Sequence, residues 1–228
     1  MGGLCTRWWG EGDRVAVLLH GMTTDSGSWW AVGPALAARG YRVVAPDLPG
    51  HGGSPCEPYT LAGAAAAVVD CVPARPELAI GHSYGGLVLA AAISDLAPDR
   101  AIYEDPPWGT PPGPEVAEFL ISQRSWTTEE FARLHPTWPP AAIANKRRAV
   151  QTWDPSTMAV VAEYPGRRPR PPPAPSLVVV GDSAPMIDHR LAEELRADGY
   201  DVQRIAEAGH NIHNDDVDAF LRAIDTWL

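Results

Sequence analysis

The chain has 228 residues, of which 45% are hydrophobic, so it can bury one sizeable core but hardly two separate domains. Its formal net charge is −10, from 18 basic and 28 acidic residues. This balance argues against a nucleic-acid partner, because phosphates require a basic surface.

The cysteines and the lengths of the apolar runs indicate in which cellular compartment the protein is expected. The three cysteines, Cys5, Cys56 and Cys71, lack the spacing of a metal site and cannot all pair, which favours a reducing cytoplasm. No early segment has the pattern of a secretory signal, and no apolar run reaches the roughly 20 residues of a membrane span. We therefore expect a cytoplasmic protein without a membrane span.

The first part of the chain alternates between apolar runs typical of buried strands and segments with helical spacing. Strands are expected at residues 4–9, 14–20, 41–47, 77–83 and 100–107. Helices are expected at residues 28–40, 59–72 and 84–97. Thr60 fits an N-cap and Gly40 a C-cap. This alternation predicts βαβ units and a parallel sheet.

The rhythm stops at residue 106 and resumes near residue 175. The segment between them is rich in Pro, Trp and Arg, and amphipathic stretches at 114–122, 128–134 and 141–153 predict helices. Strands are then expected at 176–182 and 200–208 and helices at 188–199 and 214–228. The predicted class is α/β, with a mostly parallel central sheet flanked by helices. Residues 1–105 and 175–228 would form the core and residues 106–174 a small inserted helical cap.

The sequence GHSYG at residues 81–85 fits the pattern G-x-S-x-G of a nucleophile elbow, in which a strand turns sharply into a helix. Ser83 would stand at the apex with a strained backbone, and a Cβ at Gly81 or Gly85 would collide with the turn. The pattern alone also fits a plain glycine-rich turn, but here a strand precedes it and a helix follows. The serine oxygen would then lie at the carboxyl edge of the sheet, where such folds bind ligands.

A serine hydroxyl needs a general base to become a nucleophile. His210 follows the last predicted strand and completes the chain order serine, acid, histidine, so it is the predicted base. An ordinary surface histidine is the plain alternative. His213 is expected to support the site or to begin a helix.

A carboxylate must fix the tautomer of that histidine. Asp182 ends the strand before the histidine's strand, whereas Glu104 and Asp105 end the strand that follows the helix of the elbow. Both positions place an acid at the catalytic edge. We predict Asp182, with Glu104 as the alternative, and interpret Asp188 as a helix N-cap.

An acyl-transfer site also needs hydrogen-bond donors for the oxyanion. The predicted pair is the backbone N–H of Tyr84, directly after the serine, and that of Met22, in the loop after the strand at 14–20. Gly21 lets this loop approach closely, and His20 is in place to brace it by hydrogen bonds.

Five segments occur in the order of one known family. They read LLHGM, PDLPGHGGS, GHSYGG, VVVGD and AGHNIH, and they span nearly the whole chain outside the expected cap. With them the chain resembles the α/β-hydrolase superfamily and is similar to its small esterases, lactonases and C–C-bond hydrolases with a helical cap. The resemblance implies a Ser–His–acid triad with Ser83 as nucleophile and His210 as base, and neither a cofactor nor a metal.

The chain departs from this resemblance at the acid. Many relatives place it three residues after the glycine that ends the strand, where this chain has Ala184. The serine also differs from the aspartate with which epoxide hydrolases and haloalkane dehalogenases of the superfamily open an alkyl centre. A serine alkoxide suits a carbonyl carbon instead.

These observations predict a serine hydrolase that cleaves a carboxylic ester or a lactone, or with less support a thioester, of a hydrophobic small molecule. The alternatives are a non-hydrolytic lyase, cyclase or acyltransferase on the same triad, and a ligand-sensing binding protein. Large aromatic side chains near the cleft would form an apolar pocket wall. These are Trp29, Trp108, Trp126, Trp138 and Trp153. Lys146 is the only lysine and is assigned no role, and the oligomeric state stays open.

Overall fold

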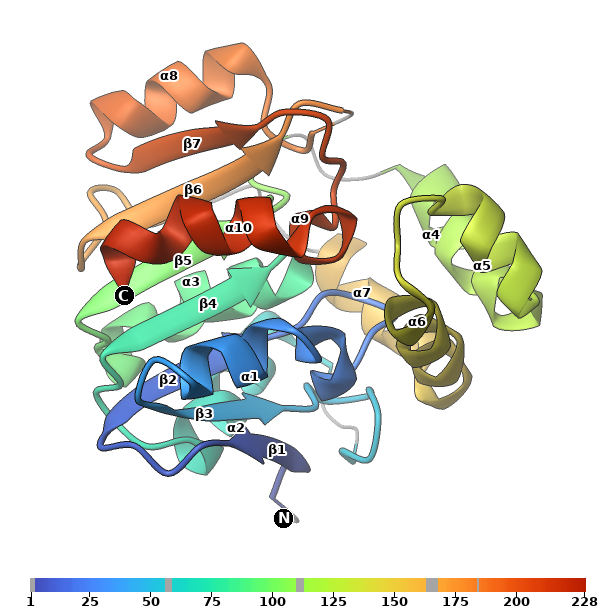
Figure 1. Cartoon of the computed structure of the whole chain (residues 1–228), viewed down its shortest axis with the longest axis horizontal. Coiled ribbons are helices and arrows are strands. Elements are labelled where there is room, and N and C mark those ends of the chain that lie inside the picture. The colour runs from blue at the N-terminus through green and yellow to red at the C-terminus, as the bar shows by residue number, and fades with distance from the viewer. Residues whose placement is uncertain (1–2, 56–58, 110–112, 163–167, 184) are drawn as a thin grey trace.

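A seven-stranded sheet forms the centre of the computed structural model, which describes residues 3–55, 59–109, 113–162, 168–183 and 185–228 (Figure 1). The strands are β1 (Thr6–Trp9), β2 (Arg14–Leu19), β3 (Tyr41–Pro46), β4 (Leu78–His82), β5 (Arg100–Glu104), β6 (Ser176–Gly181) and β7 (Asp201–Ile205). Their order is β1-β3-β2-β4-β5-β6-β7, in which β1 pairs antiparallel with β3 and the other neighbours pair in parallel. The predicted α/β class with a mostly parallel sheet is confirmed.

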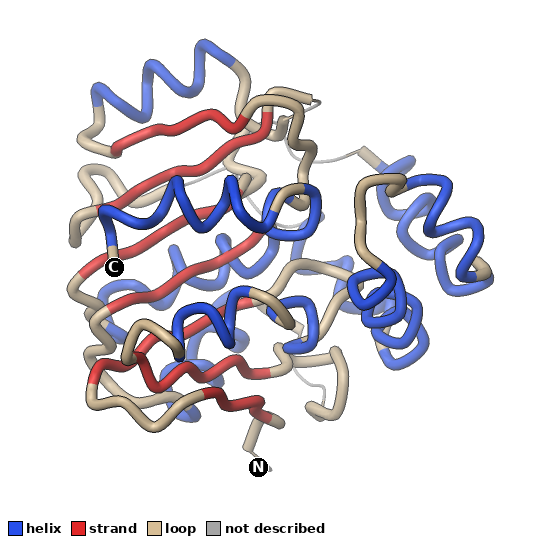
Figure 2. Tube along the Cα trace, in the orientation of Figure 1, coloured by secondary structure: helices blue, strands red, loops and turns tan. Residues whose placement is uncertain are grey.

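Helices cover both faces of the sheet, because side chains alternate between the faces along each strand (Figure 2). On β2, Ala16 and Leu18 belong to one buried cluster, and Val17 and Leu19 belong to the other. The helices α1 (Val32–Ala37) and α10 (Val217–Ile224) pack on the first cluster. The helices α2 (Leu61–Cys71), α3 (Tyr84–Leu96) and α8 (His189–Ala197) pack on the second. The result is three layers with two apolar cores.

Between β5 and β6 the described residues form four α-helices, which we call the lid helices and which lie beyond the carboxyl ends of the parallel strands (Figure 1). They are α4 (Pro114–Ser122), α5 (Thr128–Leu134), α6 (Pro140–Thr152) and α7 (Met158–Ala162). A small apolar cluster holds α5 against α6, and its buried members are Phe131, Trp138, Ala142, Ile143 and Val150. The three amphipathic stretches of this part of the chain are thus helical, whereas the boundaries of the cap at 106 and 174 stay a prediction.

The helix ends largely follow the expected caps. Thr60 Oγ1 accepts a hydrogen bond from the Gly63 N–H (3.0 Å), and Asp188 caps α8 by accepting one from the Leu191 N–H (2.7 Å). Gly40, just after α1, has φ +88°, as a C-terminal glycine requires. Two expected helices are shorter than predicted, because a 3-10 turn (Ser26–Trp29) precedes α1 and a separate α9 (Ile212–Asp215) precedes α10.

Two further observations concern the membrane and the thiols. Within the described part of the chain, no helix is both long and apolar enough to cross a membrane. Cys5 and Cys71 are free thiols, and Cys56 lies outside the described residues.

Candidate active site

The turn from β4 into α3 places Ser83 at the carboxyl edge of the sheet. Ser83 is the residue between the two elements and has φ 50° and ψ −115°, a conformation that side chains other than glycine rarely adopt. Its N–H donates to the Glu104 carbonyl oxygen on β5 (2.8 Å), and its own carbonyl accepts from the Gly86 N–H (2.9 Å). Bonds on both sides hold the strained residue in place, so the serine projects from the sheet at the start of a helix.

The two glycines of the GHSYG segment allow this turn because backbone passes close to both. A Cβ on Gly81 would lie 2.5 Å from the Gly85 carbonyl oxygen. A Cβ on Gly85 would lie 2.2 Å from the carbonyl oxygen of Leu19 on β2. Both distances are far below van der Waals contact, so the elbow requires glycine at each position.

A hydrogen-bonded chain connects Ser83 to a histidine and a carboxylate. His210 Nε2 lies 2.9 Å from Ser83 Oγ, and His210 Nδ1 lies 2.6 Å from Asp105 Oδ2. If the Nδ1–H donates to the carboxylate, Nε2 is free to accept the proton of the hydroxyl. The Asp105 side chain is fully buried and also accepts from the Met186 N–H (3.1 and 3.2 Å), whereas the His210 side chain is 27% exposed. The arrangement can therefore remove a proton from Ser83 at a site that solutes can reach.

The carboxylate that contacts His210 is that of Asp105, and not that of Asp182 or Glu104 as predicted. Asp182 is exposed, and its N–H still belongs to the ladder between β6 and β7 because it donates to Ile205 O (3.2 Å). The Glu104 carboxylate is turned to His213 instead. Ala184, the position at which the family resemblance implies an acid, lies outside the described residues.

The register between β4 and β5 explains why Asp105 meets the histidine. His82 pairs with Glu104, so the next residues, Ser83 and Asp105, lie level with each other just beyond the strand ends. Aligning the two strands on their shared Ala-Ile, residues 79–80 and 101–102, gives this register. That repeated pair is the signal from which Asp105 could have been predicted.

A second acid–histidine pair lies directly beside the first and is sealed from solvent. Glu104 accepts hydrogen bonds from the His213 N–H (2.9 Å) and from its ring Nδ1 (2.8 Å). The ring of Trp29 stacks on the His213 ring, with centroids 4.5 Å apart, and both members of the pair are at most 1% exposed. This pair anchors the loop that carries His210.

His82 adds a third support to that loop. Its Nε2 lies 3.0 Å from the His210 carbonyl oxygen and can donate to it. Burial, together with the neighbouring His210 and His213, holds the pKa of His82 well below its usual value, so the ring stays neutral. The ligand atoms of His82, Glu104 and His213 lie within 4.8 Å of one another. We assign this cluster no metal, because hydrogen bonds from His213 already occupy the Glu104 oxygens.

The loop after β2 reaches the same edge of the sheet. Buried His20 braces it, since His20 Nε2 accepts from the Leu48 N–H (2.9 Å) and Nδ1 lies 2.8 Å from Gly21 O. A Cβ on Gly21 would lie 2.6 Å from His82 Nδ1, which accounts for the glycine. Met22 and Tyr84 both line the cavity that contains Ser83. Their role as oxyanion donors stays a prediction.

A cavity of about 700 Å³ lies between this edge of the sheet and the lid helices. Ser83 and His210 line it on the side of the sheet. The apolar side chains that the lid helices contribute are Val116, Phe119, Leu120, Leu134 and Met158. The size is typical of pockets that enclose small organic molecules.

The expected tryptophan wall is largely wrong: of the five, only Trp138 lines the cavity as the described residues define it. Of the others, Trp29, Trp108 and Trp153 are buried, because such large side chains gain most by complete burial, and Trp126 is partly buried against the cluster between α5 and α6. Trp108 packs on Tyr103 and Tyr200, Trp126 contacts Phe119 and Phe131, Trp153 donates to Thr157 Oγ1, and Trp29 stacks on His213.

One residue of the cavity was missed by the sequence analysis. Lys146 on α6 is 8% exposed, lines the cavity and donates to Thr23 Oγ1 and, at 3.4 Å, to Thr23 O. Burial lowers its pKa to about 7. Its rarity, as the single lysine of the chain, was the available signal.

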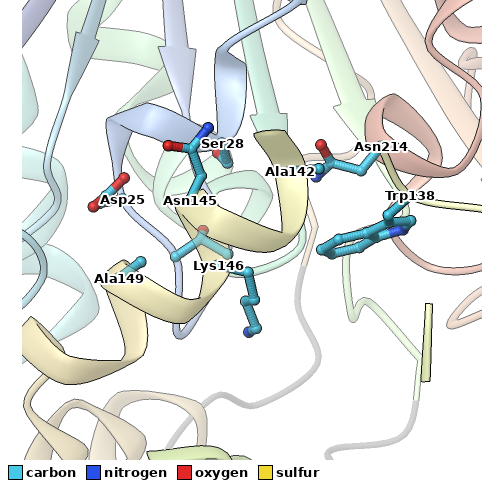
Figure 3. Close-up of a pocket in the computed structure, with 9 residues that line it drawn as sticks. Asp25, Ser28, Trp138, Ala142, Asn145, Lys146, Ala149 and Asn214 are labelled. Carbon is cyan, nitrogen blue, oxygen red and sulfur yellow. The ribbon is translucent and has the colours of Figure 1, made fainter. Parts of the chain in front are cut away.

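A second, small pocket of about 10 Å³ lies where α6 meets the 3-10 turn (Figure 3). It is lined by Asp25, Ser28, Asn145 and neighbouring residues, and it has room for about one water molecule. It is too small for a substrate, so the large cavity is the candidate site.

Comparisons with known proteins agree with this architecture. A family model described as "Alpha/beta hydrolase family" matches residues 16–223. A pimeloyl-[acyl-carrier protein] methyl ester esterase of Aeromonas hydrophila is 40% identical over 94 residues, which are 40% of this chain and 35% of that protein. A dihydrolipoyllysine-residue acetyltransferase component of the acetoin cleaving system of Pseudomonas putida is 38% identical over 108 residues, 44% of this chain and 29% of that protein. The matched part is thus about a third of each relative.

Solved structures match over nearly the whole chain. An N-formylmaleamic acid deformylase from Pseudomonas putida superposes with a TM-score of 0.78 at 22% identity, covering 96% of this chain and 94% of that one. An enol-lactonase from Burkholderia xenovorans superposes with a TM-score of 0.76 at 22% identity, covering 98% and 95%. At these identities the likeness establishes the fold alone.

Proposed function

The chain belongs to the α/β hydrolase family, and on this basis we propose that it is a serine hydrolase that cleaves a carboxylic ester or a lactone of a hydrophobic small molecule. One observation carries the proposal. Ser83, His210 and Asp105 form a continuous hydrogen-bonded chain whose serine end opens into a cavity of about 700 Å³. A nucleophile, a base and a group that orients the base are what acyl transfer requires.

In the first step Ser83 Oγ attacks the carbonyl carbon while His210 Nε2 takes its proton. Asp105 holds the Nδ1 proton of His210, which keeps Nε2 unprotonated before the attack and stabilises the imidazolium that forms. The elbow fixes Ser83 by backbone bonds on both sides, so the attacking oxygen is already placed.

The oxyanion of the tetrahedral intermediate would be held by the backbone N–H groups of Met22 and Tyr84. Both residues line the cavity next to Ser83, and Tyr84 is the first residue of α3. The N-terminus of a helix carries positive partial charge, which favours an anion there.

His210 then gives its proton to the leaving alcohol, and an acyl-enzyme remains on Ser83. A water molecule, deprotonated by the same nitrogen, attacks the acyl-enzyme and releases the acid. The apolar side chains of the lid helices support a hydrophobic substrate, because they bury hydrocarbon away from water. A methyl ester esterase among the relatives supports an ester as the bond that is cleaved.

The direct test is Ser83→Ala, with Ser183→Ala as the control because Ser183 lines the same cavity without bonding His210. Ser83→Ala should abolish turnover of a p-nitrophenyl ester and labelling by a fluorophosphonate while the circular dichroism spectrum stays unchanged. Full activity of that variant refutes the proposal. Hydrolysis in ¹⁸O-water separates it from acyl transfer, because a hydrolase incorporates one labelled oxygen into the acid.

A further inference from the structure

The buried lysine of the cavity is not accounted for by the proposed triad. Its Nζ is bonded to Thr23 on the loop that also carries Met22. None of the ion pairs among the described residues includes Lys146. A buried cation without a counter-charge is costly, and two neutral oxygens compensate it only partly.

The acids around Lys146 are occupied elsewhere or exposed. Asp215 accepts hydrogen bonds from Trp138 Nε1 (2.6 Å) and from the Gly209 N–H (2.8 Å). Asp25 is paired with Arg148 (2.9 Å), and in Figure 3 the Lys146 side chain extends away from it. Glu207 borders the cavity but is exposed. Among the described residues, none of these carboxylates forms an ion pair with Lys146, which lines the cavity.

The other described side chains that face the cavity and could carry a positive charge are three histidines. They are His82, His135 and His210. Burial lowers the pKa of His135 to about 4 and that of His82 well below its usual value, so both are neutral near pH 7. His210 is engaged between Ser83 and Asp105. Lys146 is thus the cation left to meet a ligand.

We propose that Lys146 binds a carboxylate of the substrate, so that the enzyme acts on an ester or lactone that carries a free carboxylate apart from the bond that is cleaved. This inference rests on the proposed function and narrows its substrate class. A single carboxylate matches a single ammonium, whereas a phosphate dianion would leave one charge uncompensated in a largely apolar cavity. The hydrocarbon between the two ends of the substrate would lie against the apolar side chains of the lid helices.

The proposal predicts how the affinity for an anionic substrate changes with pH. The free lysine, with a pKa of about 7, is charged below that pH and neutral above it. A bound carboxylate favours the charged form and raises the pKa. Affinity for an anionic substrate should therefore be highest below pH 7 and fall as the pH rises through and above 7, whereas affinity for a neutral analogue should not follow this course.

The single lysine makes this measurable without turnover. Ser83→Ala protein labelled with ¹³C-lysine gives one side-chain Cε resonance, whose pH titration reports Lys146 directly. The ligands are the monomethyl esters of malonic through suberic acid, with the dimethyl esters as neutral counterparts. At least one half-ester should raise the pKa by about one unit, equivalent to about tenfold tighter binding to the charged lysine. No shift with any half-ester overturns the proposal.

The same ester pairs test the proposal in the active enzyme. The best half-ester should exceed its diester in kcat/KM by about 10- to 100-fold, which is the usual contribution of one hydrogen bond to a charged group. Lys146→Met should remove most of this preference through KM, whereas Arg147→Met, the neighbouring cation outside the cavity, should keep it. A preference that survives Lys146→Met overturns the proposal. If the enzyme hydrolyses half-esters and diesters equally well, only the proposed role of Lys146 is refuted. If it hydrolyses no ester at all, the proposed function is refuted.

Discussion

Two acid–histidine pairs lie side by side in this molecule, and they differ in the two features that the proposed catalysis requires, access from the cavity and a neighbouring hydroxyl. The two acids, Glu104 and Asp105, are adjacent in the sequence, and their partners His213 and His210 are three residues apart. The Asp105–His210 pair ends at Ser83 and faces a cavity, with the histidine side chain 27% exposed. The Glu104–His213 pair is at most 1% exposed and is covered by Trp29. The two pairs consist of the same chemical groups. They differ because only the Asp105–His210 pair faces a cavity and contacts a serine hydroxyl.

The sealed pair has a structural consequence for the open one. Glu104 holds the His213 N–H and ring, and His82 lies within bonding distance of the His210 carbonyl. Both contacts fix the loop between β7 and α9, on which His210 stands. The buried pair and His82 therefore help to hold His210 in the position from which its ring contacts Ser83.

The largest expected effect comes from breaking the open pair. Asp105→Asn should lower kcat by about 10⁴-fold, because the amide donates to Nδ1 and favours the wrong tautomer of His210. The rate of ester hydrolysis at saturating substrate gives kcat for the variant and the unmodified protein. Asp182→Asn is the matched control, and equal losses in the two variants would contradict the assignment of Asp105.

Breaking the sealed pair should damage stability more than chemistry. Glu104→Gln replaces one carboxylate oxygen by a donor that faces the donors of His213, which costs about 1–3 kcal/mol of unfolding free energy. Urea unfolding gives this value, and kcat should fall less than tenfold. A loss of activity as large as that of Asp105→Asn would show that Glu104 takes part in the chemistry.

A smaller pair of effects distinguishes Trp29, which covers the sealed pair, from Trp138, which lines the cavity. Trp29→Phe should lower the unfolding free energy by about 1 kcal/mol, because it shrinks the ring stacked on His213. Trp138→Phe should instead change KM by a few-fold, since Trp138 lines the cavity. Thermal melts and initial rates separate the two, and a KM effect of Trp29→Phe equal to that of Trp138→Phe would contradict the distinction.

Strong local rules made much of the fold and part of the site predictable from the sequence. The sheet follows from apolar runs alternating with helical spacing, and the elbow from two glycines whose Cβ atoms have no room. His210 follows from its place after the last strand. These features depend on neighbours in sequence or on chain order.

The acid was missed because it depends on contacts between segments. The register between β4 and β5 decides whether Glu104 or Asp105 faces His210. Successive side chains of a strand point to opposite faces, so a shift of one residue would exchange the two. Asp182 stands at an equivalent strand end but faces solvent.

The pocket residues were missed for a related reason. A tryptophan in the sequence indicates an apolar environment but does not say whether a core or a cavity provides it. Four of the five predicted tryptophans pack against other side chains and do not line the cavity. Lys146 stands out in the sequence as the single lysine, but its place in the cavity depends on how the lid helices pack.

The most direct test of the central claim is to locate the acyl group in protein quenched during turnover of a p-nitrophenyl ester. Mass spectrometry should find one added acyl group, on the peptide that contains Ser83, and the group should be absent from Ser83→Ala. An acyl group on Lys146 or on a cysteine, or rapid hydrolysis with no acylated protein in either enzyme, would contradict the account.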